Sequence, residues 1–275
     1  MVTFGCETSE LLDGGQLAAR EAVREVVASG FQPLDSLLPA GGVRRGSLIE
    51  WVVGGSGPVG SMAGAGAMSL ACAVACRLGR AAEEPGTIVV VDRTGWFHPP
   101  AMLPWLGCGS AAARLVVTRP AHDDDEIWAI DQALRCAGVA AVLAWPQTAA
   151  SPSGDLVAGR RCAAQAWTIA MRRWQLAARS SGAVGLLVRP AATRGESSWA
   201  EARIVVAPLP GGALLERRLR LTRVGGAWAG DAADAAPAAD VVLDLARGTA
   251  GTVRQMSAAG VARRDEPWEA TCRAS

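Results

Sequence analysis

Short apolar runs alternate with longer segments of helical character along most of this chain. Six of these runs are candidate strands, at residues 47–53, 87–92, 114–120, 138–146, 182–190 and 202–208. The run TIVVVD at 87–92 is continuously apolar up to its final aspartate, which is typical of a strand covered on both faces. Strands that alternate with helices form parallel sheets. The sequence therefore predicts an α/β protein with a mostly parallel, doubly wound sheet.

The segments on either side of this core have different patterns. We expect a helix within residues 9–29 that begins near Gln16 and stops at Gly30. A loop is expected at 151–161, before the last helix of the core. The segment 216–226 alternates basic and apolar residues, as an antiparallel or edge strand does, and residues 231–240 form an acidic, alanine-rich linker. These patterns divide the chain into an N-terminal helix and tail (1–30), a core (31–208), a C-terminal β extension with linker (209–257) and a disordered tail (258–275).

The chain has 275 residues, and all of its 27 positively charged side chains are arginines. The absence of lysine excludes a Schiff-base nucleophile, a lysine general base and the lysine of a phosphate-binding P-loop. Because tyrosine is also absent, acid–base chemistry is left to carboxylates, thiols and two histidines, His98 and His122. The formal net charge of +1 gives no global attraction to nucleic acid, so any basic binding surface must be local.

Cysteine usage and hydropathy indicate the compartment. The 7 cysteines are scattered through apolar stretches without the short spacing of zinc ligands, which predicts reduced thiols in a cytoplasmic protein and no metal site. The N-terminal residues carry acids and no basic region, unlike a signal peptide. The charge-free stretch 51–76 is long enough to cross a bilayer, but it contains Pro58 and many glycines. We interpret it as a strand, a glycine loop and a helix, and expect no membrane association.

The glycine loop has the spacing of a phosphate-binding loop without its working side chains. Gly55, Gly57 and Gly60 fit the glycine pattern, but Ser61 and Met62 occupy the positions of the lysine and the hydroxyl residue in GxxxxGK[ST]. The charge that contacts the β- and γ-phosphates and the ligand of Mg²⁺ are therefore both missing. We interpret the loop as a connection between strand and helix that holds no cofactor. Weak residual ATP binding is the alternative that stays open.

Residues 34–57, LDSLLPAGGVRRGSLIEWVVGGSG, resemble the segment that leads into the P-loop of RecA-type proteins. The ordered series VVVD, PPAMLPWLG, RLVVTRP, DEIWAIDQALRCAGVAAVLAW and GAVGLLVRP is more similar to the ImuA family of RecA-like accessory proteins. In bacteria these are encoded beside ImuB, a Y-family polymerase homologue, in a DNA-damage-inducible mutagenesis cassette. The resemblance covers about residues 31–208, with a looser match at 216–226, and it implies a RecA-like core.

The same resemblance locates the positions of the ATPase residues. The catalytic glutamate of RecA-type proteins corresponds to Thr94, and the Mg²⁺-associated aspartate corresponds to Trp145. With the lysine and the hydroxyl of the loop, four working groups are replaced. We therefore expect that the chain does not hydrolyse ATP and that it is not an enzyme.

Two sets of arginines are candidate DNA- or partner-binding residues. In the helix across 161–179, Trp167, Met171, Trp174 and Ala178 form an apolar stripe. Arg161, Arg172 and Arg179 lie on roughly the opposite face, and Arg173 flanks them. The candidates are Arg161, Arg172, Arg173 and Arg179 in that helix, and Arg217, Arg218 and Arg220, with Arg223, in the basic strand. The resemblance suggests that the helix face meets phosphates. The alternatives are a solvated arginine face for the helix and edge-strand protection for the strand.

Two further clusters have simpler interpretations. The run from His122 to Glu126 could be called a metal cluster, but acids also favour the first turn of a helix. His98 lies in the segment GWFHPP without a nucleophile motif, so we interpret Trp96 and Phe97 as a core lid or a partner-contact patch.

The resemblance implies a non-catalytic adaptor in DNA-damage-induced translesion synthesis during the SOS response. Its expected partners are an ImuB-like polymerase homologue, and also RecA and single-stranded DNA. Self-association through the N-terminal helix is a further expectation, in the cytoplasm and at the nucleoid during DNA damage. Two alternatives stay open: a nucleotide-binding RecA-type ATPase or recombinase with an aberrant P-loop, and a RecA-fold inhibitor of cell division in the SOS response.

Overall fold

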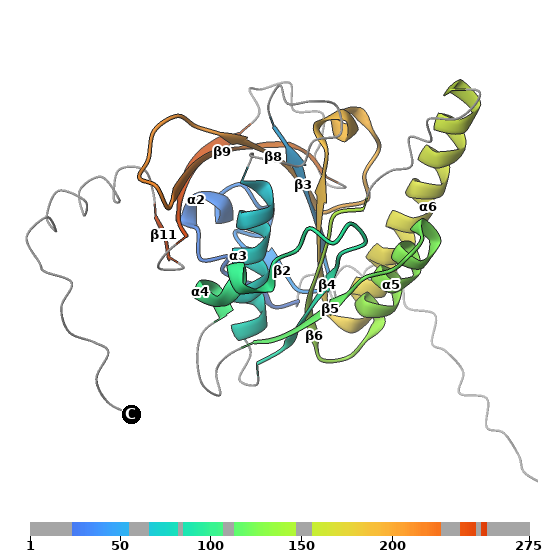
Figure 1. Cartoon of the computed structure of the whole chain (residues 1–275), viewed down its shortest axis with the longest axis horizontal. Helices are drawn as coiled ribbons and strands as arrows, with labels where there is room; N and C mark the ends of the chain where they lie inside the picture. Colours follow the sequence, from blue (N-terminus) through green and yellow to red (C-terminus); the bar gives the residue numbers. More distant parts are fainter. Residues whose placement is uncertain are drawn as a thin grey trace, which may run out of the picture.

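The computed structural model describes residues 24–54, 66–81, 85–106, 113–146, 156–226, 237–245 and 249–251. Within these residues one sheet has nine strands in the order β11-β10-β9-β8-β3-β7-β6-β4-β5 (Figure 1). The parallel strands are β3 (Leu48–Val53), β4 (Thr87–Val91), β5 (Arg114–Thr118), β6 (Val139–Ala144), β7 (Val184–Arg189) and β8 (Ala202–Pro208). The antiparallel strands are β9 (Glu216–Gly225), β10 (Ala238–Asp244) and β11 (Thr249–Gly251). The predicted mixed α/β architecture with a mostly parallel sheet is confirmed.

The path of the chain explains which face each helix covers. From the interior strand β3 the chain moves outward to β4 and β5, and then returns through β6 to β7 beside β3. Right-handed crossovers place helices on opposite faces when this direction reverses. Accordingly α3 (Ala67–Arg80) and α4 (Leu103–Leu106) lie on one face, and α5 (Asp123–Arg135) and α6 (Leu156–Ser181) lie on the other (Figure 1).

Each face of the sheet has its own apolar core. Along β3 the side chains alternate, so that Ile49 and Trp51 pack in the core with α3, whereas Leu48 packs in the core with α5 and α6. The core on the α3 face also contains the short helix α2 (Gln32–Asp35) and apolar residues of β9 and β10. The antiparallel extension therefore curves around α2 and α3 and completes the core on that face (Figure 1).

The N-terminal helix prediction is wrong where it can be checked. Residues 24–30 contain β1 (Val26–Val27), which pairs antiparallel with β2 (Val43–Arg44), and Val27 is buried. Two adjacent β-branched valines fit an extended strand better than the end of a helix. The earlier part of the predicted helix, before residue 24, lies outside the described residues.

Two other boundaries differ from the sequence prediction. The predicted loop at 151–161 is wrong from Leu156 onward, because α6 begins there and ends at Ser181. Gly159 lies within this helix, where a single glycine costs only about 1 kcal/mol. The predicted linker at 231–240 is wrong in its last three residues, which belong to β10. The predicted disordered tail at 258–275 lies outside the described residues.

The charge-free stretch at 51–76 contributes the end of β3 and the first part of α3, and residues 55–65 between them are outside the described residues. Among the helices in the described part of the chain, none combines the length and apolarity needed to cross a bilayer.

Candidate interaction pocket

A buried aspartate organises the loop that follows β4. Asp92 is 0% exposed, and its carboxylate accepts hydrogen bonds from the backbone N–H groups of Trp96 and Phe97, both at 3.0 Å. It also accepts one from the Thr94 hydroxyl at 3.2 Å and pairs with Arg119 Nε at 3.4 Å. Four donors converge on one buried carboxylate. Asp92 therefore holds residues 93–98 in one conformation.

The two positions that the resemblance assigns to catalytic carboxylates are in direct contact. Trp145, which follows β6 and is 1% exposed, donates a hydrogen bond from Nε1 to Thr94 Oγ1 at 2.9 Å. The contact forms because β4 and β6 are parallel neighbours whose carboxyl ends meet at one edge of the sheet. An indole and a hydroxyl supply neither a carboxylate ligand for Mg²⁺ nor a general base at this edge.

A cavity of about 690 Å³ opens beside this contact. Ligand sites in proteins have volumes of about 300–1,000 Å³ and are mostly apolar. The ring of Phe97 lies 6.0 Å from that of Trp145, and the ring of Trp105 lies 6.5 Å from that of Phe31. We call this cavity the aromatic pocket. Its lining residues are Met68, Ser69, Cys72, Trp96, Phe97, His98, Pro100, Ala101, Pro104, Trp105, Trp145 and Leu245.

The thiol in the aromatic pocket is poorly suited to nucleophilic chemistry. Burial raises the pKa of the Cys72 thiol to about 12, and burial also raises that of Cys76 in the same helix. A thiol with such a pKa is protonated at neutral pH and is a poor nucleophile. No group of three His, Cys, Asp or Glu side chains that could hold a metal ion is found in the described residues. What the pocket offers is aromatic and apolar surface.

The four residues of the degenerate nucleotide loop, Gly55, Gly57, Gly60 and Ser61, lie outside the described residues. The described chain resumes at Gly66, whose φ of +74° is a left-handed conformation that favours glycine. From there α3 begins at Ala67 and presents Met68, Ser69 and Cys72 to the aromatic pocket.

The arginines predicted on α6 have different surroundings. Arg172 lies over the ring of Trp199, at 5.2 Å from its centroid, and Arg173 pairs with the buried carboxylate of Asp131 at 3.3 Å. Arg161 is in α6, but its side chain lies outside the described part of the structure. Arg173, which flanks the predicted basic face, is therefore paired with a carboxylate of α5.

The basic strand β9 is in the interior of the sheet, between β8 and β10. Edge-strand protection is therefore the wrong interpretation of its arginines. Leu219 and Leu221 are buried in the core, and side chains alternate along a strand, so Arg217 lies on the opposite side of the strand from Arg218 and Arg220.

Arg220 in this strand forms an ion pair with a neighbouring strand. It donates hydrogen bonds to both carboxylate oxygens of Asp240 in β10, at 2.8 and 2.9 Å. This bidentate pair raises the pKa of the Arg220 guanidinium and lowers that of the Asp240 carboxyl. The three predicted binding arginines of β9 therefore do not form a single basic surface.

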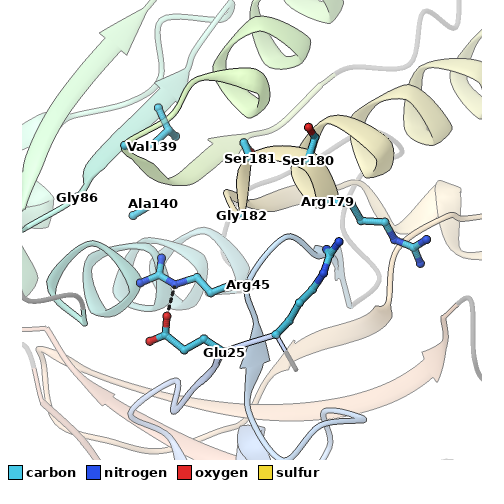
Figure 2. Close-up of a pocket in the computed structure, with 11 residues that line it drawn as sticks. Glu25, Arg45, Gly86, Val139, Ala140, Arg179, Ser180, Ser181 and Gly182 are labelled. Carbon is cyan, nitrogen blue, oxygen red and sulfur yellow. Dashed lines mark ion pairs between the residues drawn. The ribbon is translucent and has the colours of Figure 1, made fainter. Parts of the chain in front are cut away.

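A second, more polar cavity of about 540 Å³ lies at the opposite, amino ends of β4, β6 and β7 (Figure 2). Arg45 faces Glu25 in it, with 3.6 Å between Nε and the carboxylate, and also donates to the carbonyl of Leu78 near the end of α3. Arg179 lines the same cavity from the last turn of α6. Cations near helix C-termini are stabilised by the helix dipole, which gives these arginines a structural role.

A buried ion network lies on the α6 face of β3. Glu50 and Arg189 are both 0% exposed and pair at 3.2 Å, and Arg203 pairs with the other oxygen of Glu50 at 2.9 Å. Arg189 also pairs with Glu196 at 2.7 Å and lies over the ring of Trp167 at 3.8 Å. Burial lowers the pKa of the Arg189 guanidinium, against the opposing effect of the two carboxylates.

Arg203 extends the network to the loop after β7. Its guanidinium donates to the carbonyls of Thr193 at 2.8 Å and of Arg194 at 3.1 Å. These carbonyls belong to the 3₁₀ helix η3 (Ala191–Gly195). The network therefore fixes the segment that connects β7 to β8.

Sequence reasoning identified part of these sites. Thr94 and Trp145 were assigned as replaced catalytic positions, and Trp96 and Phe97 as a lid or partner patch. The contributions of Cys72, Trp105 and Leu245 to the pocket were not predicted, and neither was the Glu50 network. A signal for the network does exist: Glu50 stands inside the apolar run 47–53, and a buried carboxylate requires a partner.

We compared the chain with known proteins. No protein-family model matches the chain, and no curated protein matches it. The aromatic pocket and the contact between Thr94 and Trp145 are therefore the features from which function is inferred.

Proposed function

We propose that this chain is a RecA-like, non-catalytic adaptor of the ImuA type, which acts in DNA-damage-induced translesion synthesis. It would bind an ImuB-like polymerase homologue, and RecA or single-stranded DNA as further partners, in the cytoplasm and at the nucleoid. The observation that carries this proposal is the hydrogen bond between Trp145 and Thr94, at the edge where an ATPase needs its carboxylates.

The arrangement of the sheet supports a RecA-like core. The strand that precedes the glycine loop, β3, lies inside the sheet with β7 on one side and β8 on the other. In open α/β sheets, ligands bind beyond the carboxyl ends of the strands, where the strand order reverses. In the sequence the glycine loop comes directly after β3, which supports the proposal of a nucleotide-binding layout whose working groups are replaced.

The loss of catalysis is supported by several independent replacements. Phosphoryl transfer depends on a cation at the phosphates, a held Mg²⁺ and a group that orients the nucleophile. The chain has no lysine for the first of these, and Met62, Trp145 and Thr94 occupy the positions of the others. A folded core without these groups is suited to binding partners rather than to turnover.

Co-purification from DNA-damaged cells tests the adaptor role. A tagged full-length chain should recover the polymerase homologue of the mutagenesis cassette, and crosslinking should then map the contact to residues of this chain. Recovery of no cassette component under conditions that induce the cassette would contradict the proposal. Undamaged cells, in which the cassette is not induced, are the control.

Titration with a fluorescent ATP analogue separates the adaptor from a nucleotide-binding ATPase. The adaptor gives no saturable change at analogue concentrations that saturate a working P-loop protein in the same buffer. The inhibitor of cell division is tested by overexpression: cells that keep dividing normally support the adaptor, and filamentous cells support the inhibitor.

A further inference from the structure

The outer surface of the helices α5 and α6 carries exposed apolar side chains. The two helices lie side by side on one face of the sheet (Figure 1), and three of their large apolar side chains are more than half exposed. These are Trp128 in α5, at 61%, and Ile169 and Leu176 in α6, at 56% each. Single exposed apolar residues are common, so the relative positions of these three decide whether they form one surface.

Hydrogen bonds between the helices show that α5 and α6 run in the same direction. Trp174 of α6 donates from Nε1 to the carbonyl of Ile127, near the start of α5, at 3.2 Å. Seven residues later in both helices, the hydroxyl of Ser181 donates to the carbonyl of Leu134. One turn along α5 therefore corresponds to one turn along α6.

The ion pair between Asp131 and Arg173, at 3.3 Å, relates the exposed side chains to one another. Helical residues three or four positions apart are neighbours on one face of the helix. Trp128 precedes Asp131 by three residues in α5. Ile169 precedes Arg173 by four residues in α6, so it lies beside Trp128, one turn before the ion pair. Leu176 follows Arg173 by three residues and lies one turn after the pair. We call Trp128, Ile169 and Leu176 the helix-pair surface.

Opposite charges lie toward the two ends of the helix-pair surface. At the start of α5, Asp124 and Asp125 are exposed, and neither forms an ion pair with any residue that the structure describes. Toward the other end, Arg135 and Arg173 both pair with the single carboxylate of Asp131, and their side chains are 52% and 53% exposed. Because two guanidinium groups share one carboxylate, a net positive charge remains at this end.

We propose that the helix-pair surface is a dimer interface, against which a second copy of the chain packs through a two-fold axis. Such a contact is made by the same surface on both copies, so the surface must be complementary to itself. When α5 of one copy is antiparallel to α5 of the other, Asp124 of each copy meets Arg135 of the other. Trp128 lies near the midpoint between these two residues, so the apolar side chains come together near the axis.

The order of the charges favours a second copy over a partner of uniform charge. An acidic partner, or the phosphates of a nucleic acid, would be repelled by Asp124 and Asp125. A basic partner would be repelled by Arg135 and Arg173. The matching partner presents its charges in the reverse order, and an inverted copy of the same surface does so.

The size of the helix-pair surface predicts a weak dimer. With 13 residues, α5 is about 20 Å long, so the contact is short. Small interfaces are typical of transient complexes, and we expect an equilibrium between monomer and dimer at micromolar concentrations. The aromatic pocket is on the opposite face of the sheet, with α3 and α4, so it stays open in both copies. This inference does not depend on the proposed function, and it adds an assembly with two such pockets.

Sedimentation velocity of the full-length chain tests the dimer. Between about 1 and about 100 μM, the average mass should rise from that of one chain toward that of two. Trp128→Glu should weaken dimerisation at least about 10-fold, because it places a carboxylate near that of the second copy. Leu176→Glu is a second variant and should also weaken it. Leu214→Glu is the matched control, because Leu214 is 89% exposed in the connection between β8 and β9, and it should leave the equilibrium unchanged.

Mixing two charge variants tests how the copies are arranged. In a dimer of Asp124→Arg, two arginines face each other at both ends, and in a dimer of Arg135→Glu two carboxylates do. Each variant alone should dimerise about 3- to 10-fold more weakly than the wild type. An equimolar mixture should restore dimerisation, because the introduced arginine of one copy then faces the introduced glutamate of the other, and the native pair is kept at the other end.

Three results would overturn the inference. One is a chain that sediments with the mass of a single copy at every concentration. Another is a dimer that is unchanged in both Trp128→Glu and Leu176→Glu, with both variants shown to be folded by thermal denaturation, because a different segment then joins the copies. The third is a mixture of the two charge variants that dimerises no better than either variant alone.

Discussion

The two faces of the sheet differ in the polar groups that they bury. On the α6 face, Glu50 is buried and retained, with Arg189 and Arg203 both paired to it. On the α3 face, at the carboxyl edge, the positions expected to carry catalytic carboxylates hold Thr94 and Trp145, which bond to each other. Buried carboxylates are thus kept where each has partners, as Glu50 has in the network and Asp92 has at the carboxyl edge, whereas the contact between Thr94 and Trp145 joins two neutral groups beside a cavity.

This difference indicates which region contributes most to the stability of the fold and which region is available for binding. A buried ion pair is costly to break, because the remaining partner is left charged without water. The hydrogen bond between Thr94 and Trp145 joins neutral groups, and a neutral bond contributes about 1 kcal/mol to stability. Substitutions should therefore damage stability most in the network and least at the pocket.

The largest effect is expected for Glu50→Gln. The amide cannot neutralise Arg189 and Arg203, which have exposures of 0% and 5%, so we expect a loss of about 3–5 kcal/mol in the free energy of unfolding. Urea denaturation measures it. Glu196→Gln is the matched control, because the side chain of Glu196 is 35% exposed and its loss should cost less. A loss below about 1 kcal/mol for Glu50→Gln would mean that the two faces do not differ as stated.

The second-largest loss in the free energy of unfolding is expected for Asp92→Asn. Asparagine presents one acceptor oxygen where the carboxylate serves Thr94, Trp96, Phe97 and Arg119, so buried donors lose their partner. We expect a loss of about 2–3 kcal/mol, together with a change in tryptophan fluorescence from the pocket. Arg119→Gln should be milder, because that side chain is more than half exposed. Equal losses for the two variants would argue against Asp92 as the organising group.

A smaller effect is expected for Thr94→Val. Valine keeps the shape of threonine but leaves the Trp145 Nε1–H group without its acceptor, at an expected cost of about 1–2 kcal/mol. Trp145→Phe is the partner variant, and a double-mutant cycle isolates the pairwise energy. A coupling energy of zero would show that the contact does not stabilise this edge.

The ionisation of the Cys72 thiol should have the smallest effect on stability at neutral pH, because its effect appears only in alkaline solution. Burial raises its pKa from the ordinary 9.0 to about 12, so the folded chain keeps the neutral thiol where the unfolded chain would ionise. This contribution to stability is fully present below about pH 9 and is lost as the pH rises toward 12. Cys72→Ala should therefore show a shallower loss of stability between pH 9 and 11 than the wild type. Parallel curves for the two proteins would contradict the burial argument.

The parallel strands were predictable because each contains a short, mainly apolar run, which is typical of a strand covered by helices. The aromatic pocket was not, because α3, the loop after β4, α4, Trp145 and Leu245 converge only once the strand order is known. The ion pair of Arg173 was not predictable for the same reason. Its partner Asp131 belongs to another helix, and the sequence alone does not show that the two helices are neighbours.

Phosphate release from ATP, measured with and without single-stranded DNA, tests most directly the claim that the catalytic edge no longer works. The wild-type chain should give a rate equal to the buffer blank in both conditions, while a working RecA-type ATPase in parallel confirms the assay. Phosphate release by the pure wild-type chain that rises with added DNA, and that is lost in Trp145→Ala, would contradict the account.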